Sequence, residues 1–288
     1  MVDPPARRTR LRDPFLSMSN VLDEIVARKR VEVEKARART PLESIKARIK
    51  ELGRPRNFFR AVVADREPRT FRVIAEVKRK SPSAGVIRDD FDPADIAERY
   101  HSAGAAAISC LTDEHYFGGD LSYIHRIKDR VPIPVLRKDF IVDEYQVWEA
   151  RAAGADAILL IAECLSEGAV IDLQILATEL GMTTLVEAHS VENLYRVVNH
   201  VGFPHAGYSL LGINNRDLST MTTDLSHTFR MLELVEDPRV LVSESGIRTG
   251  EDLRRLRDHG INIALVGEHL MREDDPGAAL ARMLESVD

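Results

Sequence analysis

The stretch PVLRKDFIVDEYQVWEARAAGADAILLI, residues 134–161, decides the fold that this sequence predicts. It opens with a short apolar run, PVLRK (134–138), and closes with a second, AILLI (157–161). The segment between them, DEYQVWEARAAG (143–154), has helical periodicity and ends in Gly154, a residue type that favours the turn after a helix. The order strand, helix, strand predicts two parallel strands joined by a crossover helix.

The same unit repeats on both sides of this stretch. Short β-branched runs alternate with amphipathic segments, and eight runs are present: FRVIAEVK (71–78), AAAISCL (105–111), PVLRK (134–138), AILLI (157–161), TTLVE (183–187), LLGIN (210–214), RVLVSE (239–244) and IALVG (263–267). Glycine again precedes a strand at Gly104, Gly181 and Gly260. Eight such units predict an α/β protein, a (β/α)₈ TIM barrel. The alternative is an open doubly wound sheet, but no GxGxxG follows the first strand.

Two helices are expected before the first strand, within residues 20–53. The first runs through VLDEIVARKRVEVEKARA (21–38). For the second, Thr40 is the expected cap, followed by proline at the first helical position and by Glu43, which would complete a capping box. We therefore predict a disordered tail over residues 1–18 and a single barrel domain over residues 19–288 that includes this N-terminal helical extension.

The composition excludes several classes of protein. The 288 residues carry a net charge of −6, with a pI near 5.9, which disfavours nucleic acid as a partner. The apolar stretches are far shorter than the roughly 20 residues of a membrane span. Cys110 and Cys164 lie in apolar runs, as expected of reduced thiols in a cytoplasmic protein. Since HExxH, CxxC, GxSxG and P-loop motifs are absent from the sequence, we predict neither metal nor cofactor. The expected partner is a small phosphorylated molecule, and the oligomeric state stays open, with a monomer as the expectation.

Polar and charged side chains follow the predicted strands, at the end of a TIM barrel that carries function. They are Glu76, Lys78, Lys138, Glu187, Asn214, Arg216 and Glu244. Side chains alternate along a strand, so Ile74 shares a face with Glu76 and Lys78, and Leu136 shares one with Lys138 and Phe140. If these faces point inward, the charges meet in one mouth, where burial is costly unless they are paired or bind substrate. Neighbouring lysine and glutamate residues suit acid–base catalysis.

Two glycine-bearing turns follow the last two strands, in SESGIRTGEDL (243–253) and VGEHLM (266–271). In many TIM barrels these loops bind phosphate through backbone N–H groups. We therefore predict a phosphate site at Ser245–Gly246 and Gly267–Glu268, where Glu268 contributes only its backbone N–H. The long segment KRKSPSAGVIRDDFDP (78–93) after the first strand is of a kind that can close over substrate. The histidines near strand ends, His115, His189 and His269, are interpreted as incidental.

Seven segments of this sequence resemble signature segments of the indole-3-glycerol-phosphate synthase family, in the family's order: VIAEVKRKSPSAG (73–85), LTDEHYFGG (111–119), VLRKDFIVDEYQVWEARAAGADAILLI (135–161), LVEAHS (185–190), GINNRDL (212–218), SESGI (243–247) and LVGEHLM (265–271). The resemblance implies a (β/α)₈ barrel with an extra N-terminal helical segment. It also implies a cofactor-free, decarboxylating and dehydrating ring closure of 1-(2-carboxyphenylamino)-1-deoxyribulose 5-phosphate, a step of tryptophan biosynthesis. His115 replaces a more usual lysine, and His269 a more usual small polar residue.

The resemblance also implies roles for individual residues. Lys138 would be the general acid that protonates the substrate ketone. Glu187 would transfer protons during dehydration, supported by Glu76 and Asn214. Lys78 would hold the anthranilate carboxylate and share the acid role in the later step. The implied substrate-binding set is Ser81, Phe140, Arg216, Glu244, Ser245, Gly246, Gly267 and Glu268, of which the last four surround the phosphate.

Three other functions share parts of this pattern. Another phosphosugar barrel enzyme, such as phosphoribosylanthranilate isomerase, would have the phosphate site without needing this arrangement of lysines and glutamate. A Schiff-base aldolase would use Lys138 as its nucleophile. A non-catalytic binding barrel is disfavoured by the density of charged strand ends. For a general acid at Lys138, we expect a pKa lowered by burial and by Lys78, partly countered by the carboxylates.

Overall fold

The computed structural model describes residues 19–63, 71–217 and 222–287, so the predicted tail, residues 1–18, lies outside it. Within the described residues, eight parallel strands close into a barrel in the order β1-β10-β9-β8-β7-β6-β5-β4. Their bounds are β1 (Arg72–Val77), β4 (Ala107–Leu111), β5 (Val135–Lys138), β6 (Ala157–Ile161), β7 (Thr183–Ala188), β8 (Ser209–Asn214), β9 (Leu241–Glu244) and β10 (Ile263–Val266). The predicted (β/α)₈ barrel is confirmed.

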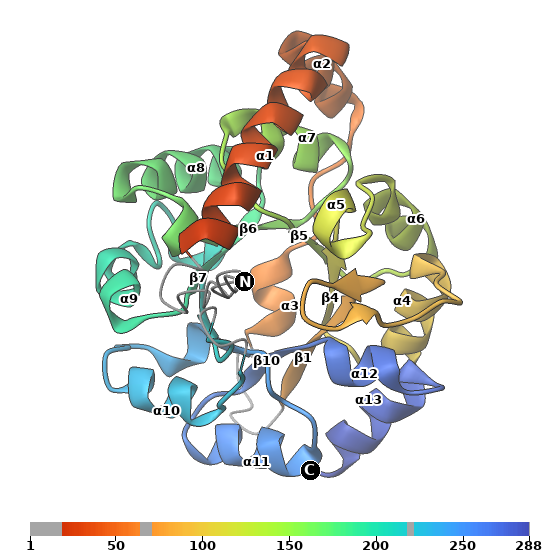
Figure 1. The fold of residues 1–288 in the computed structure, drawn as a ribbon, viewed down its shortest axis with the longest axis vertical. Coiled ribbons are helices and arrows are strands. Elements are labelled where there is room, and N and C mark those ends of the chain that lie inside the picture. Colours follow the sequence, from red (N-terminus) through yellow and green to blue (C-terminus); the bar gives the residue numbers. More distant parts are fainter. Residues whose placement is uncertain (1–18, 64–70, 218–221, 288) are drawn as a thin grey trace, which may run out of the picture.

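A ring of helices surrounds the strands (Figure 1). It comprises α4 (Pro93–Ser102), α5 (Glu114–Phe117), α6 (Ser122–Arg130), α7 (Glu144–Ala152), α8 (Glu167–Glu179), α9 (Val191–Val197), α10 (Ser226–Leu232), α11 (Gly250–Asp258), α12 (Glu268–Arg272) and α13 (Pro276–Glu285). Five of these helices are followed by a glycine with positive φ, α5 by Gly118 and four others by Gly104, Gly154, Gly181 and Gly260. The last four are the predicted stops, because glycine adopts this conformation without steric cost.

The interior of the barrel follows the predicted alternation of side chains. Apolar residues at the centre of the strands, including Ile74, Leu136, Leu185, Leu210 and Val242, belong to one buried inner cluster. The next inward positions along these strands are Glu76, Lys138, Glu187, Gly212 and Glu244, because side chains of equal parity share a face. The inner face therefore changes from apolar to charged toward the carboxyl ends of the strands.

The short helix α3 (Phe58–Val62) closes the opposite, amino end of the barrel, and Figure 1 shows it in the middle of the ring. Phe58 and Val62 are fully buried within the inner cluster. The backbone N–H of Phe59 donates to Oγ1 of Thr183, the first residue of β7 (3.3 Å). Apolar side chains thus fill this end of the barrel and leave the other end to the polar groups.

The N-terminal extension consists of α1 (Ser19–Arg39) and α2 (Leu42–Glu51), in agreement with the two predicted helices. The predicted capping box of α2 is wrong. The helix begins one residue later than expected, so its cap position holds Pro41, which has no side-chain acceptor. Glu43 instead pairs with Lys46 of the same helix (3.2 Å).

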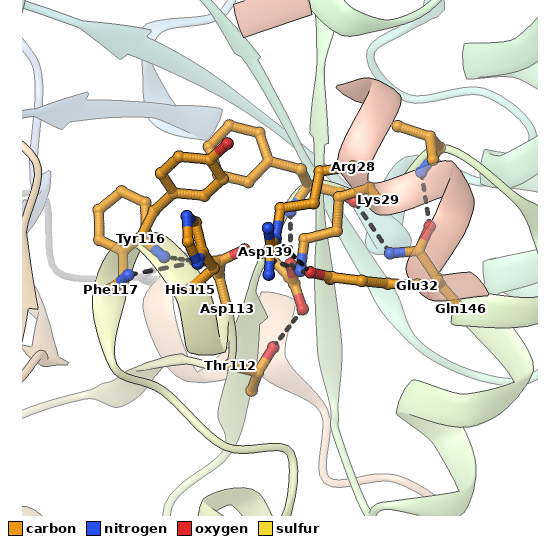
Figure 2. Close-up of polar contacts among 12 residues, drawn as sticks. Arg28, Lys29, Glu32, Thr112, Asp113, His115, Tyr116, Phe117, Asp139 and Gln146 are labelled. Carbon is orange, nitrogen blue, oxygen red and sulfur yellow. Dashed lines mark hydrogen bonds and ion pairs between the residues drawn. The ribbon is translucent and has the colours of Figure 1, made fainter. Parts of the chain in front are cut away.

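A buried ion-pair cluster fastens α1 to the carboxyl end of the barrel (Figure 2). The Lys29 amino group contacts Asp113 (2.8 Å) and Asp139 (2.9 Å), which follow β4 and β5. Thr112 and Arg137 complete the hydrogen bonding of Asp139. Burial opposes the charged form of Lys29, but the charges of Asp139 and Asp113 outweigh it and raise its pKa. The extension is therefore held beside the functional end by a paired charge.

No helix in the described part of the chain is long and apolar enough to cross a membrane.

Candidate active site

A cavity of about 680 Å³ opens at the carboxyl ends of the strands. This volume lies within the range of small-molecule sites. The structure places all thirteen predicted site residues along its wall: Glu76, Lys78, Ser81, Lys138, Phe140, Glu187, Asn214, Arg216, Glu244, Ser245, Gly246, Gly267 and Glu268. Residues far apart in the sequence meet here because parallel strands end at the same side of the barrel.

Lys138 and Glu187 line the cavity as a directly bonded pair. The Lys138 amino group donates to Glu187 (2.7 Å) and lies 3.4 Å from the Glu244 carboxylate. The amide of Asn214 donates to the other Glu187 oxygen (3.1 Å). These groups come from β5, β7, β8 and β9, so the barrel register sets their distances.

The expectation of a lowered Lys138 pKa is wrong. Burial does oppose the ammonium form, but the charges of Glu187, Glu244 and Glu76 outweigh it and raise the pKa of Lys138 above its usual range. Lys138 is therefore protonated in the free protein. This state suits a proton donor and disfavours a Schiff-base nucleophile, which needs a neutral amine.

The two carboxyl groups beside Lys138 have opposite pKa shifts. Burial would raise the pKa of Glu187, but Lys138 and His189 lower it to about 2. Burial and repulsion by Glu187 raise the pKa of Glu244 well above its usual value. Two close carboxyl groups of this kind hold one proton between them, so the site contains an ionised and a protonated carboxyl group at once.

A second lysine–glutamate pair lies at the end of β1. The Lys78 amino group donates to Glu76 (2.6 Å), and both side chains are nearly buried. Lys78 lies two residues beyond Glu76 on the same inward face, so its ammonium group is nearer the mouth of the cavity. A cation in this position can bind a substrate carboxylate.

Two glycines make room for the inner carboxylates. A Cβ atom at Gly212 of β8 would lie 2.3 Å from a Glu244 oxygen, and one at Gly267 would lie 2.4 Å from a Glu76 oxygen. Both separations are shorter than any normal contact. The carboxylates therefore occupy space that inward side chains fill elsewhere in the barrel.

The turns after β9 and β10 form the side of the cavity where phosphate binding is predicted. Ser245 (φ 67°) and Gly246 (φ 79°) are two consecutive residues in the left-handed region. Gly267 precedes α12, and the Glu268 carboxylate is paired with Arg216 (3.1 Å) and Arg272 (3.0 Å). Because two arginines pair with its carboxylate, the group of Glu268 that remains to bind an anion is its backbone N–H.

The opposite wall of the cavity is apolar. Phe117 and Phe140 lie with ring centroids 6.2 Å apart, and Leu159 and Ile161 of β6 extend this surface. Ile25 of α1 also lines the cavity, so the extension contributes to the wall. The cavity therefore joins an apolar side, suited to an aromatic ring, to a side rich in backbone N–H groups.

The segment after β1 is more ordered than a plain loop. It contains a short antiparallel hairpin of β2 (Lys80–Ser81) and β3 (Gly85–Val86). Arg88 holds it to the carbonyl groups of Glu273 (2.9 Å) and Asp274 (3.0 Å), beyond α12. The hairpin thus places Ser81 at the cavity while its base is attached to a neighbouring βα unit.

A family model described as indole-3-glycerol phosphate synthase matches residues 22–283, nearly the whole described chain. The chain belongs to this family.

Curated relatives agree with this assignment to the indole-3-glycerol phosphate synthase family. Proteins of that name from Rhodopirellula baltica and Chromobacterium violaceum are each 46% identical to this chain over 266 residues. The alignments cover 92% of this chain and 99% and 98% of the relatives. The relative from Rhodospirillum rubrum is 43% identical over 267 residues. The resemblance seen in the sequence is confirmed.

Solved structures of other proteins share only the fold with this member of the synthase family. A tryptophan synthase subunit alpha from Legionella pneumophila superposes with a TM-score of 0.56 at 13% identity, covering 84% of this chain and 98% of that one. A 3-hexulose-6-phosphate synthase from Salmonella typhimurium superposes with a TM-score of 0.58 at 14% identity, covering 75% and 98%. At such low identity the likeness supports the barrel architecture and no shared chemistry.

Two further residues that the sequence analysis does not assign to the site, His189 and Glu163, line the cavity. The sequence analysis interprets His189 as incidental; in the structure its ring lies between Glu187 (3.3 Å) and Glu163 (3.1 Å). Glu163 follows the apolar run of β6, so the rule that strand ends carry function could have found it. The strand pattern does not include Glu163, because this residue lies within a short 3₁₀ turn, Ala162–Cys164, that follows β6.

Within the described residues, no group of three or more histidine, cysteine, aspartate or glutamate side chains is placed to hold a metal ion. The absence of a cofactor stays a prediction from the sequence.

Proposed function

We propose that this chain closes the indole ring of 1-(2-carboxyphenylamino)-1-deoxyribulose 5-phosphate, with Lys138 as the general acid. Membership of the synthase family makes it a decarboxylating lyase of tryptophan biosynthesis. The observation that carries the assignment of Lys138 is its place on the cavity wall, protonated and in contact with Glu187. General acid catalysis requires a proton donor at this point of the site.

The first step joins the ring carbon that bears the carboxylate to the ketone carbon of the sugar chain. Lys138 gives its proton to the ketone oxygen as this bond forms. Lys78 holds the carboxylate, which then leaves as carbon dioxide. In the dehydration that follows, Lys78 shares the acid role toward the departing hydroxyl group, and Glu187 takes a proton from the substrate. Glu76 and Asn214 hold Lys78 and Glu187 in position.

Substrate binding is proposed to follow the two sides of the cavity. The phosphate binds to backbone N–H groups at Ser245–Gly246 and Gly267–Glu268, while Phe140 contacts the aromatic ring. Ser81 of the hairpin and Arg216 position the carboxylate side of the ring. Glu244, held protonated, offers a hydrogen bond to a substrate hydroxyl group. The apolar wall and the anion site lie apart, which suits a substrate with an aromatic head and a phosphate tail.

The cellular setting is also part of the proposal. Cys110 is buried and Cys164 partly buried, and burial raises the pKa of both thiols, so they are unreactive. Together with the acidic charge balance, this supports a cytoplasmic protein that binds a small phosphorylated substrate and not nucleic acid.

The direct test is to mix purified protein with 1-(2-carboxyphenylamino)-1-deoxyribulose 5-phosphate and to record indole fluorescence. Product should accumulate without added cofactor. Borohydride added during turnover should leave the enzyme active, because no imine forms at Lys138. Absence of an indole product, or inactivation by borohydride only when substrate is present, would contradict the proposed chemistry.

A further inference from the structure

We propose that His189, held by Glu163, supplies the solvent proton that each turnover consumes, and that it delivers this proton through Glu187 to Lys138. This inference rests on the proposed function. It gives a role to a histidine and a glutamate that the ring-closing steps leave unused.

The reaction has a fixed proton balance. Ring closure adds one proton to the ketone oxygen, and carbon dioxide leaves its bonding electron pair behind in the ring system. Dehydration adds a second proton to the hydroxyl group, which leaves as water, and removes one proton from the neighbouring carbon. Two protons enter the substrate and one returns, so one proton per turnover must reach the lysines from solvent.

The position of His189 fits this requirement. Its Nε2 atom lies 3.3 Å from the Glu187 oxygen Oε1, and Glu187 Oε2 accepts from Lys138 at 2.7 Å. One carboxylate therefore separates the imidazole from the general acid. The His189 ring lines the cavity and its side chain is 9% exposed, so the imidazole borders the space from which a proton can be regained.

Glu163 fixes the orientation of the imidazole. Its Oε2 atom lies 3.1 Å from Nδ1 of His189, and its Oε1 atom accepts from the His189 backbone N–H (2.8 Å). His227 of α10 contacts the His189 carbonyl oxygen (3.0 Å) and holds the same backbone from the other side. With Nδ1–H bound to a carboxylate, Nε2 is the nitrogen that gives and takes the proton.

The surrounding charges favour transfer at the right moment. Burial opposes the imidazolium, but Glu163 and Glu187 outweigh it and raise the pKa of His189, while Lys138 acts against them. In the free protein, Lys138 keeps the pKa of Glu187 low. Once Lys138 has given up its proton this charge is gone, so Glu187 becomes more basic. Its Oε1 atom then takes the proton from His189, and rotation of the carboxyl group brings that proton to the neutral Lys138 amine.

The chain offers a matched control for a histidine–glutamate pair. His200 contacts Glu167 at 2.7 Å between α8 and the turn after α9, away from the cavity residues. Both pairs join an imidazole to a carboxylate, but only the His189 pair touches Glu187. If activity falls when His189 is removed but not when His200 is removed, the loss depends on the contact between His189 and Glu187.

The test compares His189→Gln, His189→Ala, Glu163→Gln and His200→Gln with the wild type. Rapid mixing with excess substrate separates the first turnover from later ones. In both His189 variants, the first equivalent of indole product should form at the wild-type rate, while kcat falls about tenfold or more and KM stays within about threefold. Free imidazole should restore kcat in His189→Ala. In Glu163→Gln, the alkaline limb of the kcat–pH profile should move toward lower pH. His200→Gln should match the wild type.

Two results would overturn the inference. One is an unchanged kcat and pH profile in His189→Gln. The other is a first turnover slowed as much as later ones with no rescue by imidazole, which would reduce His189 to a structural support of Glu187. A wild-type protein that forms no indole product would instead contradict the proposed function itself, so the two failures are distinguishable.

Discussion

The interior of this barrel is filled in opposite ways at its two ends. At the amino end, Phe58 and Val62 fill the interior, and the buried carboxylate of Asp156 is fully paired with Lys128 and the backbone N–H groups of Arg56 and Val135. At the carboxyl end, the inward positions hold lysine and glutamate around an open cavity.

The contrast shows how the fold separates stability from chemistry. Apolar filling and satisfied hydrogen bonds stabilise the amino end. Crowded carboxyl groups at the carboxyl end, such as Glu187 beside Glu244, cost stability, because burial and the Glu187 charge disfavour ionisation of Glu244. Substitutions at the two ends should therefore change different measurable quantities.

The largest effect is expected for Lys138→Ala. Removing a general acid typically lowers the rate by about 10²–10⁴-fold, so kcat should fall at least about a hundredfold. The variant should keep its fold by circular dichroism and bind a substrate analogue within roughly tenfold of the wild type. Lys138→Arg should restore little activity, because a guanidinium group keeps its proton. A near-native kcat in Lys138→Ala would show that Lys138 is not the general acid. Full activity in Lys138→Arg would show that the residue acts only as a fixed positive charge.

The next effect tests the amino end. Phe58→Ala should lower the free energy of unfolding by about 3–5 kcal/mol, as is usual for a buried phenylalanine. Its kcat at a temperature where it stays folded should remain within about twofold of the wild type. Urea titration and steady-state kinetics measure the two quantities, and Phe203→Ala, at a half-exposed position, is the control. A tenfold loss of kcat in folded Phe58→Ala would mean that the two ends are coupled.

Acid should loosen the extension over the mouth before it unfolds the barrel. Burial would raise the pKa of Asp139, but Arg137 and Lys29 lower it to about 2. A carboxylate with a lowered folded-state pKa stabilises the fold above pH 4 and loses this contribution as the pH falls toward 2, here on the order of 2 kcal/mol. The only tryptophan, Trp148, lies on α7 and packs against a small apolar cluster that contains Val33 of α1 and Ile45 of α2. Its fluorescence therefore reports on the contact between the extension and the barrel.

The measurement compares Trp148 fluorescence with far-ultraviolet circular dichroism between pH 5 and pH 2. Fluorescence should change first on acidification. In Lys29→Met, the acid dependence of the fluorescence should be smaller, since one partner of Asp139 is already gone. Coincident transitions in the wild type would show that the extension and the barrel unfold together.

The smallest effect concerns the phosphate side. Gly246→Asp should raise KM about tenfold or more, because it sets a negative charge beside the bound phosphate. The control is Gly260→Asp, at a glycine with a similar positive φ (82° against 79°) and open space around it, far from the cavity. Equal KM values in the two variants would show that the substrate phosphate does not bind beside Gly246.

Local patterns account for what could be predicted from the sequence. The alternation of Ile74, Glu76 and Lys78 sets which side chains point inward, and this depends on the strand alone. The glycine stops of the helices are equally local. The capping box at Thr40 failed although it is local, because Pro41 occupies the cap position and Lys46 offers Glu43 a different partner.

Charge balance could not be predicted in the same way. The pKa of Lys138 depends on three glutamates from β1, β7 and β9, whose distances follow from barrel closure and not from any single segment. The pairing of Glu163 with His189 also joins two separate βα units. Such contacts require the three-dimensional register, so the sequence gives the members of the site and not their protonation states.

The two glycines beside the inner carboxylates have a consequence for how this barrel can be redesigned. A side chain added at Gly212 would displace the carboxylate of Glu244, and one added at Gly267 would displace Glu76. Enlarging Gly212 to alanine should become tolerable only when Glu244 is shortened to aspartate. Redesign of this enzyme for another substrate would therefore need paired substitutions, in which the residue on one strand becomes larger and the residue on the neighbouring strand becomes smaller.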